Sequence, residues 1–290
     1  MKLPELFAKK DFVLSFELFP PKTDAGMTEL MRNVGELNQH QPDFFTCTYG
    51  AGGSTQDKTL TIASDVRSDF DVPVASHLTC VGSTREQLRT YLTDARVRGV
   101  DYIVALRGDP PAGESEFKPV EGGLSYANEL VEMIREEFPE FGILVAGYPE
   151  VHQEAPDAKT DLENLVRKVD AGADAIVTQL FYDNDDFFRF RDDCVKAGIT
   201  VPVIPGLLPV LSLKQVQRIA SLCKAGLPED FVAKLEKGDS PQAQFEVGVE
   251  HSIKQTQGLL DAGVPGIHYY VLNKATATNQ IVANVTGLRA

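Results

Sequence analysis

The 290-residue chain contains no tryptophan and only four cysteines, which are Cys47, Cys80, Cys194 and Cys223. None of them forms a CxxC pair, and four in a chain of this length do not make a disulfide scaffold. We therefore interpret them as small buried thiols in a reducing compartment. No apolar run approaches the roughly 20 residues that a membrane-spanning helix needs, and the first ten residues lack the apolar core of a signal peptide. These absences predict a cytoplasmic protein.

Positive charge is also scarce, since 28 lysines and arginines stand against 42 aspartates and glutamates. The net charge of −14 repels the phosphates of nucleic acids and the anionic surfaces of membranes. Neither is therefore expected as a partner, and small molecules remain the expected substrates.

The apolar residues occur in short β-branched runs that alternate with longer amphipathic stretches. Continuous apolar runs of this length are typical of parallel strands covered on both faces. The predicted strands are 13–18, 43–48, 72–78, 102–106, 143–148, 175–180, 201–205 and 267–271. The predicted helices between and after them are 27–38, 55–68, 84–98, 125–137, 160–171, 185–197, 213–222 and 276–286. Eight such units predict an α/β fold, a closed (β/α)8 TIM barrel with right-handed crossovers, and the alternative is a doubly wound open sheet.

One connection is longer than the pattern requires. Between 205 and 267 the sequence holds two further helical patterns, 227–237 and 242–262. We expect these to be extra helices between the seventh and eighth strands. Because no linker or low-complexity tract interrupts the chain, residues 1–290 are expected to form a single barrel domain.

Polar residues gather at the predicted carboxyl ends of the strands, which is where the active site of such a barrel lies. Ionisable groups in apolar strands are costly unless they have partners. Their presence at one rim of the barrel therefore predicts an active site. These residues are Glu17, Thr48, His77, Arg107, Gly108, Asp109, Tyr148, His152, Gln179 and Lys274.

Two carboxylates stand out among them. Glu17 lies in the apolar sequence SFELFPP, which is expected to raise its pKa and to keep it protonated as a general acid. The alternative is a buried glutamate paired with a lysine or arginine. Asp109 lies between Gly108 and Pro110, where it would place a rigid negative charge beside a developing cation, unless it only caps a turn.

Metal and dinucleotide signals are weak. His77, His152, Glu150 and Asp109 follow no HxH or HExxH spacing, so no metal is expected. The GAGGS sequence at 50–54 follows a strand, but it lacks the third glycine of a dinucleotide fingerprint. We interpret it as a flexible loop.

The predicted helix 160–171 carries Asp161, Asn164, Arg167 and Lys168. Spacings of three and four residues place Asp161, Asn164 and Lys168 on one face, with Arg167 beside them. Such groups bind hydroxyls and phosphates, so this face is a candidate nucleotide site, and the alternative is an ordinary solvated face.

Several longer motifs occur in order across nearly the whole chain: SFELFPPK, TYGAGGST, SHLTC, IVALRGDPP, AGYPEVHQEA, DLENLVRKVDAGAD, TQLFYD, VIPGLLPV and YYVLNKA. In these motifs the chain resembles bacterial methylenetetrahydrofolate reductases. The resemblance implies an oxidoreductase barrel that holds FAD at its carboxyl rim and works by a ping-pong mechanism. NADH, or alternatively NADPH, would reduce the flavin, which would then reduce methylenetetrahydrofolate to 5-methyltetrahydrofolate for methionine synthesis. A homo-oligomer is also expected.

The resemblance also implies roles for individual residues. Glu17 would be the general acid that helps to open the substrate ring to an iminium cation, and Asp109 would lie beside the flavin and the pterin. The positions implied to contact folate are Glu17, Gln179, Gln215 and Lys274. The positions implied to bind FAD are Thr48, His77, Arg107, Gly108, Asp109, Tyr126, Ala127, Tyr148, His152, Asp161, Asn164, Arg167 and Lys168.

The chain departs from the family pattern at two positions. Lys274 stands where an arginine is usual, and Ile219 stands where an aromatic residue is frequent. Both changes are expected to weaken contacts with the substrates. The chain also stops at Ala290, so the carboxyl-terminal regulatory domain of larger relatives is not expected.

Two other functions compete with this reading. One is a lyase that uses a Schiff-base lysine, but neither Lys168 nor Lys274 lies in an apolar strand where desolvation would lower its pKa. The other is an FAD-binding subunit that receives electrons from a partner redox protein.

Overall fold

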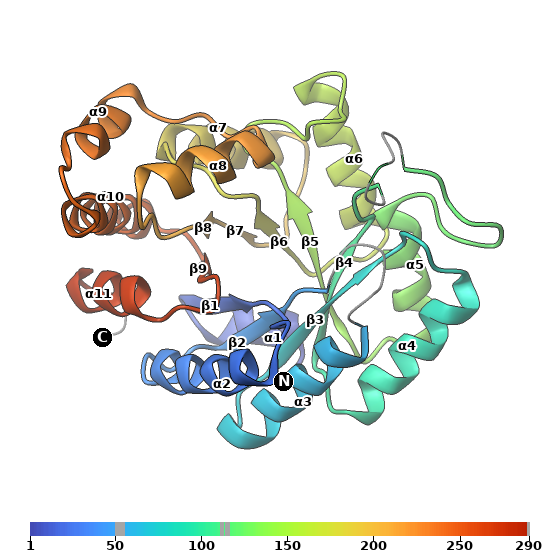
Figure 1. The fold of residues 1–290 in the computed structure, drawn as a ribbon. Helices are drawn as coiled ribbons and strands as arrows, with labels where there is room; N and C mark the ends of the chain where they lie inside the picture. Colours follow the sequence, from blue (N-terminus) through green and yellow to red (C-terminus); the bar gives the residue numbers. More distant parts are fainter. Residues whose placement is uncertain (50–55, 111–112, 114–116, 289–290) are drawn as a thin grey trace.

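The computed structural model describes residues 1–49, 56–110, 113 and 117–288. Within these residues, parallel strands form one sheet that curls into a barrel, in the order β7-β6-β5-β4-β3-β2-β1-β9-β8 (Figure 1). The strands are β1 (Val13–Leu18), β2 (Phe44–Cys47), β3 (Val74–Thr79), β4 (Tyr102–Leu106), β5 (Gly142–Gly147), β6 (Ala175–Thr178), β7 (Val203–Ile204), β8 (Gly206–Leu207) and β9 (Gly266–Tyr270). The predicted barrel is confirmed.

Helices cover the outside of the strands (Figure 1). They are α2 (Asp24–Asn38), α3 (Gln56–Phe70), α4 (Arg85–Val97), α5 (Ala127–Glu137), α6 (Ala158–Asp170), α7 (Asn184–Lys196), α8 (Leu213–Cys223), α9 (Glu229–Lys237), α10 (Pro241–Asp261) and α11 (Thr276–Asn284). The two extra helices predicted before the last strand are present as α9 and α10. None of the helices in the described residues is both long and apolar enough to cross a bilayer. The GAGGS sequence lies outside the described residues.

The seventh predicted strand differs from expectation, because Pro205 divides it into β7 and β8. β7 pairs with β6 and β8 pairs with β9, so one short segment joins the two edges of the sheet. Proline has no N–H to donate to a ladder. Side chains supply the bonds instead: Thr178 Oγ1 accepts from Gly206 N at 2.9 Å, and Thr178 O accepts from the Tyr270 hydroxyl at 2.6 Å. Only glycine fits at 206, since a Cβ there would lie 2.2 Å from Thr178 O.

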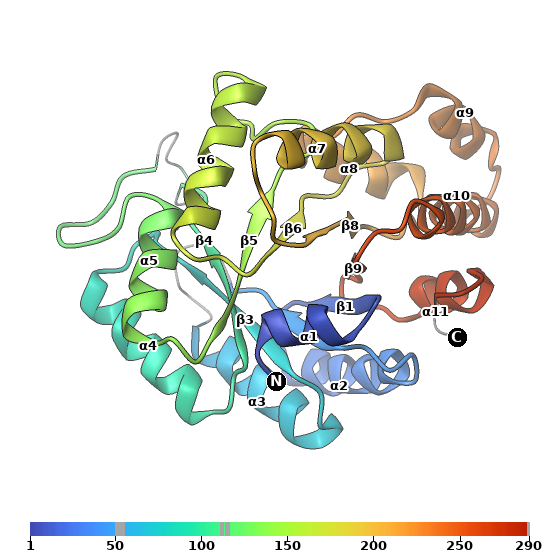
Figure 2. The same cartoon turned by 180° about the vertical axis from the view of Figure 1, so that it is seen from behind.

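A short helix, α1 (Leu3–Lys9), precedes the first strand and was not predicted. Leu3 and Leu6 pack against side chains at the amino ends of the strands, among them Val13 and Tyr102. Gly142, at the start of β5, leaves room for this contact, because a Cβ there would lie 2.6 Å from Leu3 Cβ. The helix, which lies in front of the strands in Figure 2, therefore covers the amino end of the barrel. The candidate site lies at the opposite end of the barrel, where the strands have their carboxyl ends.

Candidate active site

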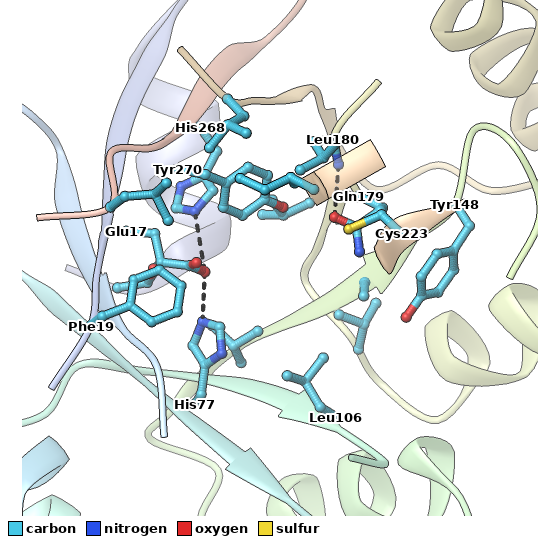
Figure 3. A pocket seen from close by; sticks show the side chains of 18 residues that line it. Glu17, Phe19, His77, Leu106, Tyr148, Gln179, Leu180, Cys223, His268 and Tyr270 are labelled. Atoms are coloured by element: carbon cyan, nitrogen blue, oxygen red, sulfur yellow. Dashed lines mark hydrogen bonds and ion pairs between the residues drawn. The ribbon is translucent and has the colours of Figure 1, made fainter. Parts of the chain in front are cut away.

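A largely apolar cavity of about 350 Å³ lies at the carboxyl ends of the strands (Figure 3). Its polar lining residues include Glu17, His77 and Gln179, which had been predicted as site residues. The remaining lining residues are Phe19, Thr46, Val104, Leu106, Val145, Ala146, Tyr148, Val177, Leu180, Leu208, Ile219, Cys223, His268, Tyr270 and Leu272. Tyr148 is also among the predicted site residues, so the fold places predicted residues from the ends of four strands around one apolar space.

Glu17 is buried at the wall of this cavity, with 6% of its surface exposed. Figure 3 shows its carboxylate between the rings of His77 and His268, whose Nε2 atoms lie 3.2 and 3.9 Å from Oε2. Burial raises the pKa of Glu17, as the apolar sequence had suggested, but interactions with the two histidines outweigh burial and lower the pKa to about 2. The expected raised pKa is therefore wrong, and the buried partners are histidines instead of a lysine or arginine.

A second cavity, of about 390 Å³, adjoins the first and shares Leu106, Ala146 and Tyr148 with it. It is the more polar of the two. Its lining includes many of the positions implied to bind FAD: Arg107, Tyr126, Ala127, Tyr148, His152, Asp161, Asn164, Arg167 and Lys168. The two cavities therefore offer one elongated space with an apolar and a polar part.

The helix α6 brings its polar face to this second cavity. Asp157 caps the helix by accepting from Thr160 N at 2.8 Å. In the first turn, Asp161 Oδ2 accepts from His152 N at 2.9 Å, which ties the helix to the loop after β5. That loop is strained, because Val151 is β-branched and has φ 72°. The four residues predicted from the spacing of α6 as a candidate nucleotide site therefore all line this cavity.

Lys168 reaches from α6 into the barrel wall. Its Nζ donates to the carbonyl of Ala146 in β5 and lies 5.9 Å from the centre of the Tyr148 ring. Burial lowers the pKa of this ammonium to about 8, and the charge of Asp161 opposes the change. The expectation that this lysine is not desolvated is wrong, because its long side chain is half-buried although it starts on a surface helix.

Arg107 is held by a neighbouring acid. Its guanidinium donates two hydrogen bonds to Glu154, at 2.6 and 2.8 Å, and lies 5.1 Å from the centre of the Phe117 ring. This pair lowers the pKa of the Glu154 carboxyl. An anion entering the cavity would therefore meet Arg107 already oriented, with Arg167 and Lys168 as further cations.

Asp109 lies at the rim and lines neither cavity. Its side chain is exposed. Burial raises the pKa of Tyr148 and of Cys223, both of which line the apolar cavity, and the charge of Asp109 adds to the increase in both. The carboxylate is therefore close enough to act electrostatically on a molecule in that space.

Four other predicted residues also lie outside the cavity walls. Gln215 Oε1 accepts from Leu211 N at 2.7 Å at the start of α8, and Lys274 is exposed beyond β9. Thr48 and Gly108 follow β2 and β4. The structure thus places these four at the carboxyl end of the barrel without bringing them into the described cavities.

Sequence reasoning missed several cavity residues. His268 and Tyr270 lie inside β9, whereas the predicted site residues of that strand lie beyond its carboxyl end. The alternation of a strand points to them, since 266, 268 and 270 share one face. Asn273 follows the same strand, and its side-chain amide accepts from Phe19 N at 2.8 Å and donates to Phe19 O at 2.7 Å, which fixes Phe19 at the wall of the cavity.

Comparison with known proteins adds independent information. Residues 2–286 match the family model described as methylenetetrahydrofolate reductase. The 5,10-methylenetetrahydrofolate reductase of Escherichia coli strain K12 is 40% identical over 264 residues, which are 90% of this chain and 86% of that protein. A probable methylenetetrahydrofolate reductase (NADH) of Oryza sativa subsp. japonica is 39% identical over 98% of this chain. The chain spans about half the length of such plant relatives.

A solved structure supports the fold. An uncharacterised protein from Clostridium thermocellum, described as binding two copies of 5-methyl-5,6,7,8-tetrahydrofolic acid, superposes with a TM-score of 0.67. The match covers 97% of this chain and 96% of that one, at 14% sequence identity. At this identity the similarity extends to the barrel architecture alone.

Proposed function

Because the chain belongs to the methylenetetrahydrofolate reductase family, we propose that it reduces 5,10-methylenetetrahydrofolate to 5-methyltetrahydrofolate as an FAD-dependent enzyme. The product would supply methyl groups for methionine synthesis. The observation that carries the proposal is the pair of adjoining cavities, one apolar with a buried carboxylate and one polar with three cations.

The residues of the two cavities fit FAD. Arg107, Arg167 and Lys168 are cations suited to a pyrophosphate, and Asp161 and Asn164 are suited to ribose hydroxyls. The adjoining apolar walls suit a planar ring system. Thr46 Oγ1, in the wall of the apolar cavity, is buried and has no partner among the described residues, as expected of a group that bonds to a bound molecule. When bound, FAD would supply hydride acceptance from NADH, or alternatively NADPH, and hydride donation to the folate in a ping-pong sequence.

Glu17 would supply the proton for the folate reaction, and because its carboxyl is ionised at neutral pH in the free protein, it must first take up that proton. The five-membered ring of the substrate opens when its bond to N10 breaks, and N10 then needs a proton. Glu17 lies at the wall of the apolar cavity, where its carboxyl would face a bound substrate. The carboxylate that remains is stabilised by His77 and His268.

Asp109 and Gln179 would act on the same substrate. Ring opening leaves a positive iminium group, and the negative charge of Asp109 at the cavity rim favours that cation. Gln179 lines the cavity with its amide, whose Oε1 accepts from Leu180 N at 2.9 Å and leaves the NH2 group to donate. A pterin ring carries matching acceptor atoms.

The test is the absorption spectrum of the purified protein. We expect a yellow protein that bleaches anaerobically with NADH and regains its colour when methylenetetrahydrofolate is added. A protein without bound flavin after reconstitution would contradict the proposal. A flavin that neither NADH nor NADPH reduces would instead favour a subunit that takes electrons from a partner.

A further inference from the structure

The loop after β5 and the end of α8 meet at the carboxyl rim of the barrel, next to the apolar cavity. Glu150 Oε1, in the loop, accepts from Gly226 N, which follows α8, at 2.6 Å. A second bond joins the same two segments, since Lys224 Nζ donates to Gln153 O at 3.5 Å. Glu150 belongs to the AGYPEVHQEA motif but lines neither of the described cavities. A role for this residue therefore has to act through what it holds.

The end of α8 forms part of the wall of the apolar cavity. Ile219 and Cys223, one helical turn apart, both line it, and Figure 3 shows Cys223 there. The helix ends at Cys223, because Lys224 takes the left-handed conformation with φ 53°. The last turn of a helix lacks partners for its carbonyls and frays most readily. The position of this wall therefore depends on what holds the chain just beyond α8.

The loop that carries Glu150 is itself fixed on both sides. Val151 has φ 72°, a strained conformation for a β-branched residue, which persists only where the surroundings determine it. Before Glu150, Arg189 donates to a loop carbonyl at 3.3 Å. After it, Asp161 Oδ2 accepts from His152 N at 2.9 Å. The carboxylate of Glu150 thus extends from a fixed loop towards a helix end that would otherwise fray.

The geometry at position 226 is specific for this contact. A Cβ there would lie 2.8 Å from Glu150 Oε1, so a larger residue would displace the carboxylate. The other oxygen, Oε2, is buried and has no partner among the described residues. A buried carboxylate oxygen without a partner is costly, so the position of this side chain is not explained by the stability of its own loop. The bond to Gly226 is the favourable contact that this position provides.

We propose that Glu150 is a positioning residue that holds the end of α8 and thereby sets the wall of the apolar cavity where folate binds, an inference that rests on the proposed function. Without the bond, the last turn of α8 would spend more time away from the cavity, together with Ile219 and Cys223. The fraction of molecules with a complete wall would fall, and the apparent affinity for folate would fall in proportion. Proton transfer uses Glu17, so the rate at saturating folate should be kept.

The first test needs neither FAD nor folate. Hydrogen exchange of residues 220–226 is followed by mass spectrometry in the cofactor-free protein. Glu150→Leu loses the charged acceptor and should accelerate exchange there roughly tenfold, while α5 exchanges as in the parent. Gly226 is exposed, so water can bond to its N–H and the variant should fold. Glu150→Gln keeps an acceptor oxygen and should stay close to the parent. Unchanged exchange at 220–226 in Glu150→Leu would overturn the proposal.

Gly226→Ala disturbs the same contact from its other side. The added methyl group displaces the Glu150 carboxylate and should accelerate exchange at 220–226 as Glu150→Leu does. Because both changes remove one contact, the double variant should exchange no faster than the faster single variant. Effects of the two changes that multiply would mean that the residues act separately, and the proposal would be wrong.

Glu246→Leu is the matched control. Glu246 is an exposed glutamate that accepts from Gln242 Nε2 at 2.8 Å within α10, and it lines neither of the described cavities. The control removes one carboxylate and one hydrogen bond away from α8, so exchange at 220–226 and the KM for folate should stay unchanged. A change as large as that in Glu150→Leu would show a general response to the lost charge and would count against the proposal.

The second test uses the FAD-loaded enzyme. Glu150→Leu should raise the KM for methylenetetrahydrofolate about three- to tenfold and leave kcat and the FAD content nearly unchanged. Glu150→Gln should restore most of the parent KM. A lower kcat with an unchanged KM would contradict a role in setting the wall. If the parent protein does not reduce folate while the exchange rates change as expected, the proposed function fails and the hold of Glu150 on α8 stands.

Discussion

We predict that the Lys168 ammonium lowers the stability of the cofactor-free protein and that its favourable contribution is to the binding of the cofactor. Moving the pKa of its ammonium from 10.5 to about 8 corresponds to a penalty of roughly 3 kcal/mol on the charged form. Lys168→Met keeps the long apolar stem and removes the charge. The variant also loses the hydrogen bond from the ammonium to the Ala146 carbonyl, which costs about 2 kcal/mol because the donor is charged. We therefore expect Lys168→Met to be more stable than the parent by about 1 kcal/mol at pH 7 when no cofactor is bound.

The sign of the pH dependence follows from proton linkage. Because the folded pKa is depressed, the unfolded chain binds more protons between pH 8 and about 10.5, so the stability of the parent rises with pH across that window. Below pH 8 the penalty is fully present. Lys168→Met has no such titration, so its advantage should be constant below pH 8 and should shrink and vanish as the pH approaches 10.

The assay is urea unfolding of cofactor-free protein at pH 7 and pH 9.5. The matched control is Lys159→Met. Lys159 is exposed on the same helix, and its Nζ lies 3.9 Å from Glu163 Oε1, so its replacement should change the free energy of unfolding little. FAD titration should show the opposite ranking, with Lys168→Met binding about 10- to 100-fold more weakly because a charged hydrogen bond to phosphate is lost. The reasoning is refuted if Lys168→Met is no more stable than the parent at pH 7, or if both proteins gain equally between pH 7 and pH 9.5.

Four further variants test the remaining assignments. Glu17→Gln should still accept hydride from NADH but lose about 10²- to 10⁴-fold in folate reduction, and an equal loss in stopped-flow traces of both half-reactions would show that Glu17 is structural. Asp109→Asn should raise the flavin potential and slow folate reduction; an unchanged or lower potential would place Asp109 away from the flavin. Lys274→Ala should raise the KM for folate alone, because folate carries an anionic tail, and steady-state kinetics with each substrate varied would expose a general defect. Ala173→Val should destabilise the protein by about 1 to 3 kcal/mol, since Ala173 is buried and its N–H bonds to Lys168 O at 3.3 Å. In melting curves this loss of stability should shrink as FAD is added. A loss that is the same at every FAD concentration would show that Ala173 has no link to the cofactor site.

The sequence determined the barrel almost completely. Strand and helix patterns are local, so β1, β4 and most helices were placed within a few residues of their true bounds. Two errors have different physical causes. The helix α1 is stabilised by packing under the strands more than by its own seven residues, and Pro205 divides a strand whose apolar pattern is continuous.

The sequence also predicted roles for Glu17 and Lys168, which line the two cavities, but only the tertiary structure decided their protonation chemistry. The apolar neighbours of Glu17 in sequence predicted a raised pKa, whereas His77 and His268, brought in by other strands, reverse the direction. On the other side of its ring, His268 Nδ1 lies 2.8 Å from the hydroxyl of Ser15, a residue 253 positions away in the chain. For Lys168, the helical pattern left a solvated face as an alternative, whereas in the fold the ammonium is desolvated and donates to the carbonyl of Ala146 in β5. A pKa depends on desolvation and on the charges and hydrogen-bonding groups within a few ångströms. The tertiary structure of the barrel determines which groups lie that close.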